Sequence, residues 1–204
     1  MAEKKPMTRR RFLVRAAQGA TSVAALPLTG LAQAAVPVKP ATGGGRIITR
    51  TLGRTGIRVP VVNMGVMNAD NPALVKRSFE MGIRHFDTAW GYQKGRNEEM
   101  VGSVLKELKA RDQAIIATKV PPGRPEMMDQ MGDKLVEEEF LARFDQSLTR
   151  LQTDHVEILY VHNISEPKLR KRPGILSAVE KLKKAKKAHH IGFSTHTNMA
   201  ECIA

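Results

Sequence analysis

Strand-like and helix-like segments alternate along most of this chain, and that alternation limits its fold more than any other feature. Short apolar runs predict strands at residues 61–64, 83–87, 114–119, 156–162 and 190–193. Asn71 as an N-cap, Pro72 in the first turn and Gly82 as a stop predict a helix at residues 71–81. Helical spacing of apolar residues predicts further helices at residues 97–109, 133–151 and 175–188, with a fifth beginning near Thr197. Strands joined by helices pair in parallel, so the pattern predicts an α/β fold with one parallel sheet.

Two segments precede this alternation. Residues 46–52 and 57–59 flank the turn formed by residues 53–56, which contains two glycines, and so predict a β-hairpin. Residues 35–45 are rich in proline and glycine and follow no period, which indicates a linker. We therefore expect the folded domain to occupy residues 46–204.

The first 34 residues have the features of an export signal. Residues 8–13, Thr-Arg-Arg-Arg-Phe-Leu, closely resemble the twin-arginine motif, and no charged residue occurs from Ala16 to Val38. Ala32-Gln33-Ala34 fits a signal-peptidase site, and the run is too polar for a stable membrane span. The sequence predicts a cleavable signal over residues 1–34, recognition by the twin-arginine translocase, and a periplasmic or otherwise exported protein.

The net charge of +13 first suggests a nucleic-acid partner. Removing the signal would take away a net five positive charges and leave +8. Lysines cluster at residues 181–187, but apolar residues interrupt them at helical spacing and no aromatic residue accompanies them, which favours a solvated helix face. We expect no nucleic-acid partner. The single cysteine, Cys202, excludes an internal disulfide.

Polar residues of catalytic types stand where the predicted strands end. Asp87 ends the second strand, Lys119 the third and His162 the fourth, while Ser194 follows the fifth and Tyr92 lies in the loop after Asp87. The carboxyl ends of parallel strands in a barrel meet at one mouth, so we expect these side chains to converge.

These residue types together suit proton transfer to an oxygen. A lysine ammonium beside a phenol stabilises the phenolate and makes a tyrosine a better proton donor, and a carboxylate would orient that lysine. A histidine could hydrogen-bond the substrate oxygen. Each residue also has a structural interpretation: Lys119 as an ordinary strand-end lysine and His162 as a core histidine. Their joint placement favours catalysis. His189, His190 and His196 lack the spacing of helical metal ligands, and we predict no metal site.

The chain resembles the aldo-keto reductase family from Leu52 to Ser194. The matching motifs occur in the family's order and spacing at residues 52–57, 86–92, 97–99, 117–119, 147–151, 158–162 and 191–194. The resemblance implies a TIM-type (β/α)8 barrel, of which these residues hold the hairpin cap and about five strand-helix units.

The resemblance also implies a function. It places the family's tetrad on Asp87, Tyr92, Lys119 and His162, with Tyr92 as general acid in the reduction of an aldehyde or ketone to an alcohol. The hydride donor would be NADPH, or else NADH, and Ser194 would hold its carboxamide. Thr195 stands where the family usually has asparagine, which removes half of that contact.

A closed barrel of this kind needs about 250 residues, and residue 204 falls just inside the fifth predicted helix. We therefore expect the amino-terminal part of a reductase, inactive by itself. The alternative is a non-catalytic half-barrel module that binds a partner. Residues 95–99 resemble bacterial reductases that carry an iron-sulfur segment beyond the barrel, so such a cluster would belong to a segment after residue 204.

Overall fold

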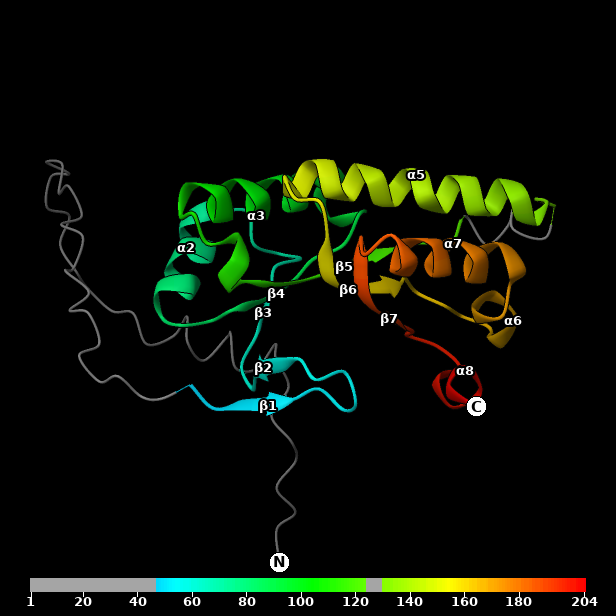
Figure 1. Ribbon diagram of the computed structural model, residues 1–204, viewed down its shortest axis with the longest axis horizontal. Coiled ribbons are helices and arrows are strands. Elements are labelled where there is room, and N and C mark those ends of the chain that lie inside the picture. Colours follow the sequence, from blue (N-terminus) through cyan, green and yellow to red (C-terminus); the bar gives the residue numbers. More distant parts are fainter. Residues whose placement is uncertain (1–46, 124–129) are drawn as a thin grey trace, which may run out of the picture. The chain divides into compact units, whose positions relative to one another are not determined.

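The computed structural model describes residues 47–123 and 130–204, and its strands form two sheets (Figure 1). Thr49–Thr51 (β1) and Arg58–Pro60 (β2) pair antiparallel as the predicted hairpin. The second sheet is parallel and contains five strands in chain order. They are Met64–Gly65 (β3), His85–Asp87 (β4), Ile115–Val120 (β5), Val156–Val161 (β6) and Ala188–Phe193 (β7).

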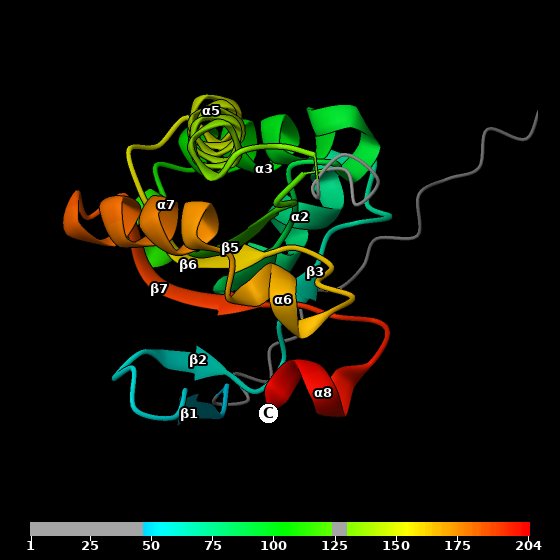
Figure 2. The ribbon, with the colours of Figure 1, turned by 90° about the vertical axis from the view of Figure 1, so that its right-hand side faces the viewer.

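Helices connect the parallel strands, as the alternation predicts. The longer ones are Pro72–Glu80 (α2), Arg96–Glu107 (α3), Asp133–Leu151 (α5) and Pro173–Lys184 (α7), and all four lie on one face of the sheet (Figures 1 and 2). Short helical segments are Tyr92–Gly95 (η1), Arg111–Gln113 (η2), Pro167–Arg170 (α6) and Met199–Ile203 (α8). Among the described residues, no helix is both long enough and apolar enough to span a bilayer.

Local sequence signals set the limits of α2. The Asn71 side chain accepts a hydrogen bond from the Ala73 N–H at 2.9 Å, and Pro72 occupies the first turn, where a missing N–H costs nothing. The helix stops before Gly82, whose φ of 96° is unfavourable for other residues. Asn71, Pro72 and Gly82 therefore mark both ends of this helix, as the sequence predicts.

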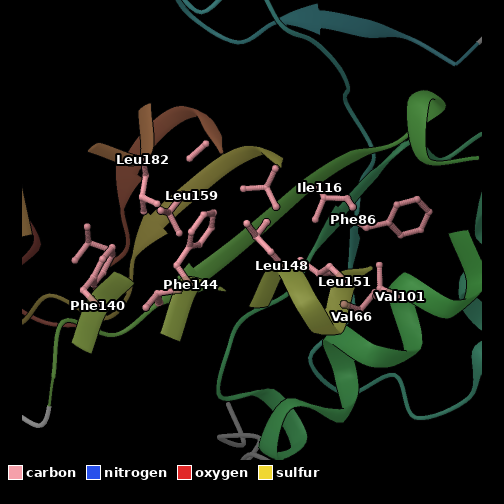
Figure 3. Packing of buried hydrophobic residues seen from close by; sticks show 14 of the residues in the cluster. Val66, Phe86, Val101, Ile116, Phe140, Phe144, Leu148, Leu151, Leu159 and Leu182 are labelled. Carbon is pink, nitrogen blue, oxygen red and sulfur yellow. The ribbon is translucent and has the colours of Figure 1, made fainter. Parts of the chain in front are cut away.

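The core lies between the parallel sheet and its covering helices. Phe86, Ile116 and Leu159 from three strands are fully buried and pack with aromatic and aliphatic side chains of α5, including Phe140 and Phe144 (Figure 3). Side chains alternate between the two faces of a strand. Asp87 and Tyr160 directly follow Phe86 and Leu159, and Lys119 comes three residues after Ile116. All three therefore belong to the opposite face of the sheet, away from these helices.

Two sequence-based boundaries assign residues to the wrong element. Val61 and Val62 are 53% and 60% exposed, and the Val61 N–H bonds the Ile48 carbonyl, so residue 61 extends the hairpin rather than β3. The helix predicted to reach residue 188 ends at Lys184. It ends there because Lys186 adopts a left-handed φ of 58° and Ala188 already pairs with Val156 in the sheet.

Gly102 lets α3 approach the end of α5 closely. A Cβ at this position would lie 2.6 Å from the backbone carbonyl atoms of Leu151, which cannot move as a side-chain end can. Gly102→Ala should lower the free energy of unfolding by about 1–3 kcal/mol, although alanine is the better helix former. Urea denaturation would measure this, with the exposed Lys106→Ala as control. Equal stability of Gly102→Ala and the wild type would contradict the close approach.

Candidate active site

The carboxyl ends of neighbouring strands hold three of the predicted site residues. Asp87 is the last residue of β4, Lys119 is the penultimate residue of β5, and His162 directly follows β6. The strands are parallel, with Asp87 paired to Ala117 and Lys119 paired to Tyr160, so the three residues lie at one edge of the sheet. Tyr92 joins them from η1, five residues after Asp87.

Lys119 is the centre of this group. Its side chain is largely buried, and its Nζ forms an ion pair with the Asp87 carboxylate. The same Nζ donates to the Thr88 carbonyl at 2.8 Å and lies 3.4 Å from the Tyr92 hydroxyl. The contacts with Asp87 and Thr88 thus orient the ammonium, and its third contact is with the phenol of Tyr92. A positive charge held there would stabilise a phenolate at Tyr92.

His162 faces the same phenol. Its ring meets the Tyr92 ring edge-on, with centroids 6.0 Å apart and planes at 82°. Burial lowers the pKa of His162 below its usual 6.5, and the nearby charge of Lys119 lowers it further. The imidazole is therefore neutral at neutral pH. A neutral ring carries one N–H, which can donate to a carbonyl oxygen without adding a charge to the site.

The loop that carries Tyr92 continues the sheet ladder before it turns. The Thr88 and Trp90 N–H groups donate to the Ala117 and Lys119 carbonyls at 2.8 and 2.9 Å. Gln93 then adopts a left-handed φ of 50°, which is strained for a residue with a Cβ. Its amide donates to the Met67 and Ala69 carbonyls, which offsets this strain. Hydrogen bonds of Trp90 before Tyr92 and of Gln93 after it therefore hold the backbone of Tyr92 in place.

Ser194 has the hydrogen-bonding state that a carboxamide contact requires. Its Oγ accepts from the Asn163 N–H at 3.0 Å, next to His162, so the hydroxyl hydrogen remains to be donated to a carbonyl oxygen. This donor fits the amide oxygen of a nicotinamide. Thr195 does not extend the contact, because its hydroxyl donates to the Thr197 carbonyl at 2.6 Å within a local turn.

Sequence reasoning missed Tyr160. It belongs to the same sheet face as Lys119, and Gly192 on β7 leaves space for its ring, since a Cβ there would lie 2.9 Å from ring carbons. Burial raises the pKa of Tyr160, and the Asp87 charge adds to the effect, so this phenol keeps its proton. Its position two residues before His162, on the same face of a strand, is the signal that could have found it.

A second histidine is buried two residues before Asp87. His85 is 8% exposed, and no group in the described part of the chain hydrogen-bonds either ring nitrogen. Burial lowers the pKa of His85 from 6.5; Asp87 opposes this shift and Lys119 adds to it. The folded protein therefore favours the neutral ring.

Replacing His85 by leucine should weaken the pH dependence of stability. Because the pKa of His85 is lower in the folded state, the unfolded chain binds a proton first as the pH falls below 6.5. The contribution is complete above that pH and declines below it, by at most about 1.4 kcal/mol per pH unit. Between slightly alkaline and mildly acidic pH, urea denaturation should show a smaller loss of unfolding free energy for His85→Leu than for the wild type. An identical loss in both proteins would contradict the assignment.

Another cluster lies near the amino ends of β6 and β7. His155, Glu157 and His189 place one potential metal-binding atom each within 4.8 Å of one another. However, the two oxygens of Glu157 already accept from Arg111 at 3.0 Å and from the Ile116 N–H at 2.7 Å. The histidine rings stack at 23°, so their lone pairs do not converge on one point. We interpret the cluster as structural.

Known proteins match the part of the chain that contains the parallel sheet and the candidate site. A model of the Aldo/keto reductase family matches residues 63–202. L-galactose dehydrogenase of Arabidopsis thaliana is 34% identical over 161 residues, which cover 73% of this chain and 49% of that protein. L-glyceraldehyde 3-phosphate reductase of Escherichia coli (strain K12) is 31% identical over 167 residues, covering 75% and 46%. The chain spans about half the length of the curated relatives it matches.

Solved structures give the fold. An aldo-keto reductase from Bacillus halodurans in its holo form superposes with a TM-score of 0.60 at 26% identity, covering 73% of this chain and 50% of that one. An aldo/keto reductase from Brucella melitensis has a TM-score of 0.58 at 27% identity, covering 75% and 56%. The parallel sheet and its helices are therefore part of a TIM-type barrel, which confirms the predicted fold class.

Proposed function

The chain belongs to the aldo/keto reductase family, and we propose that it reduces aldehydes or ketones to alcohols with a nicotinamide cofactor, NADPH or NADH. One observation carries the proposal: the Lys119 ammonium is paired with Asp87 and at the same time faces the Tyr92 hydroxyl. The names of the relatives, a dehydrogenase and a reductase, support an oxidoreductase. The relative from Bacillus halodurans, 26% identical, was solved in its holo form, which supports a bound cofactor.

In this proposal, each of the five site residues has a distinct role. The cofactor, when bound, supplies the hydride that reaches the carbonyl carbon. Tyr92 donates its hydroxyl proton to the carbonyl oxygen as negative charge develops there, and Lys119 stabilises the phenolate left behind. Asp87 holds the ammonium in place. His162 donates a hydrogen bond that orients the substrate oxygen, and Ser194 donates to the carboxamide of the nicotinamide.

Turnover of a reactive aldehyde tests the proposal. The full-length protein carrying these residues, given 4-nitrobenzaldehyde and NADPH, should consume NADPH and form 4-nitrobenzyl alcohol in equal amounts. NADH should be tried in parallel. If neither cofactor is oxidised above the rate without protein, with a panel of aldehydes and ketones, carbonyl reduction is excluded and the non-catalytic half-barrel module becomes the better interpretation.

We also propose that the twin-arginine translocase exports the protein and that residues 1–34 are then cleaved, leaving residues 35–45 as a linker. These residues lie outside the described part of the chain. Support comes from residues 8–13, the uncharged run and the Ala32-Gln33-Ala34 site. Export in the folded state would suit an enzyme that binds its cofactor in the cytoplasm.

Replacing both Arg9 and Arg10 by lysine should block this route. The charge is kept, but the receptor for such signals reads the arginine pair, which lysine does not replace. Cell fractionation and immunoblotting should find uncleaved precursor in the cytoplasm. The matched control, Lys4→Arg with Lys5→Arg, should be exported normally. Cleavage of the Arg9→Lys/Arg10→Lys protein at the wild-type rate would show that the general secretion route is used instead.

A further inference from the structure

A buried ion pair joins α3 to α5 behind the Tyr92 loop. Glu98 is fully buried, and its carboxylate lies 3.3 Å from the guanidinium of Arg150, whose side chain is 22% exposed. Burial raises the pKa of Glu98, a direction that reflects the cost of a charge in this position. The proposed mechanism uses neither residue. A charge pair in such a place requires a reason, because apolar residues could pack two helices as well.

Arg150 reaches from α5 to the backbone of the Tyr92 loop. Its Nη1 donates to the Trp90 carbonyl at 3.0 Å, while the Trp90 N–H donates to the Lys119 carbonyl at 2.9 Å. Both backbone polar groups of Trp90 are thus engaged. Trp90 stands two residues before Tyr92, so these bonds fix the point from which the loop carries the phenol towards Lys119.

Glu98 connects the same ion pair to the lysine strand. The Thr118 hydroxyl donates to its carboxylate at 2.6 Å, and Thr118 immediately precedes Lys119. The end of the loop fits closely around the guanidinium as well. Gly95 has a φ of 93°, and a Cβ there would lie 2.4 Å from Arg150 Cζ. The pair therefore contacts both ends of the Tyr92 loop and the strand that carries Lys119.

We propose that Arg150 is a positioning residue, which with Glu98 holds the Tyr92 loop so that the phenol faces the Lys119 ammonium. The inference rests on the proposed function, since it assigns a purpose to that alignment. Neither residue belongs to the face of the sheet that would meet substrate. Both act through the backbone of residues 90–95 and through Thr118.

The test variant replaces both members of the pair, Arg150→Met with Glu98→Gln. Removing one charge alone would leave the other buried without a partner and could prevent folding, whereas the double variant keeps similar volumes and no charge. Arg143→Met is the matched control. Arg143 also comes from α5, and its guanidinium lies 5.6 Å from the centre of the Trp90 ring, compared with 5.7 Å for Arg150. Within the described residues, the Arg143 guanidinium donates to the Pro121 carbonyl and the Glu139 carboxylate, and not to the backbone of the Tyr92 loop.

The first readout needs no activity. The two tyrosines of this sequence, Tyr92 and Tyr160, can be labelled at the ring carbon that bears the hydroxyl, and spectra of Tyr92→Phe and Tyr160→Phe assign their resonances. The double variant should shift the Tyr92 resonance or split it into several, and leave that of Tyr160 unchanged. Arg143→Met should change neither. A Tyr92 resonance identical to that of the wild type in a folded double variant would overturn the inference.

The second readout separates positioning from general structure. In the double variant, kcat for aldehyde reduction should fall by about 10- to 100-fold, while KM for NADPH stays within about twofold, since misplacement of the phenol affects chemistry rather than cofactor binding. Arg143→Met should retain wild-type kcat. An unchanged kcat in the double variant would overturn the inference. If the wild type itself shows no turnover, the proposed function fails, and the tyrosine spectra alone decide the positioning role.

Discussion

Replacing Tyr92 by phenylalanine should lower kcat for 4-nitrobenzaldehyde by about 10²–10⁴-fold, while the Kd for NADPH changes little. Phenylalanine keeps the ring that packs edge-on against His162 and removes the hydroxyl that faces Lys119. The carbonyl oxygen would then have to take its proton from water as the hydride arrives. Binding energy for the cofactor would be retained, because the hydroxyl is the single group removed.

Steady-state turnover and a fluorescence titration of NADPH would measure the two effects separately. Tyr160→Phe is the matched control: it removes the hydroxyl of the other tyrosine, for which no bond to Lys119 is found in residues 47–123 and 130–204. It should retain most of the activity. Turnover by Tyr92→Phe at the wild-type rate would show that another group donates the proton.

Lys119→Met should lower kcat by about 10²–10³-fold, the cost expected on losing one preorganised group that stabilises developing charge. Methionine keeps an unbranched side chain one atom shorter, but it cannot pair with Asp87, donate to the Thr88 carbonyl or stabilise a phenolate. Kinetics of the variant beside Lys106→Met, an exposed lysine on α3, would separate this effect from a change in net charge. A kcat for Lys119→Met within about twofold of the control would contradict the role of the ammonium.

Most of the fold can be predicted from short-range sequence patterns. Asn71, Pro72 and Gly82 mark the two ends of one helix, and the apolar spacing of residues 133–151 matches α5 at both ends. The errors occur where a distant partner decides. Val61 is apolar enough for a buried strand, yet its N–H donates to the Ile48 carbonyl and extends the hairpin.

In the candidate site, too, some residues could be predicted from the sequence and others required the structure. Asp87 and Lys119 could be brought together from the sequence because parallel strands place their carboxyl ends side by side. Arg150 could not be connected to the site, since its bond to Trp90 joins residues 60 apart, and no local pattern shows that α5 ends beside that loop. Tyr160 required the strand register as well as the space that Gly192 leaves.

Transfer of deuterium from cofactor to substrate tests the proposed carbonyl reduction most directly. The full-length protein would be mixed with 4-nitrobenzaldehyde and NADPH deuterated at its reactive ring carbon, on one face at a time. We expect one deuterium at the benzylic carbon of the alcohol from one face only, formed at least about 10²-fold more slowly by Tyr92→Phe. Alcohol without deuterium from either face, or equal rates in the two proteins, would contradict a site in which Tyr92 donates the proton during hydride transfer.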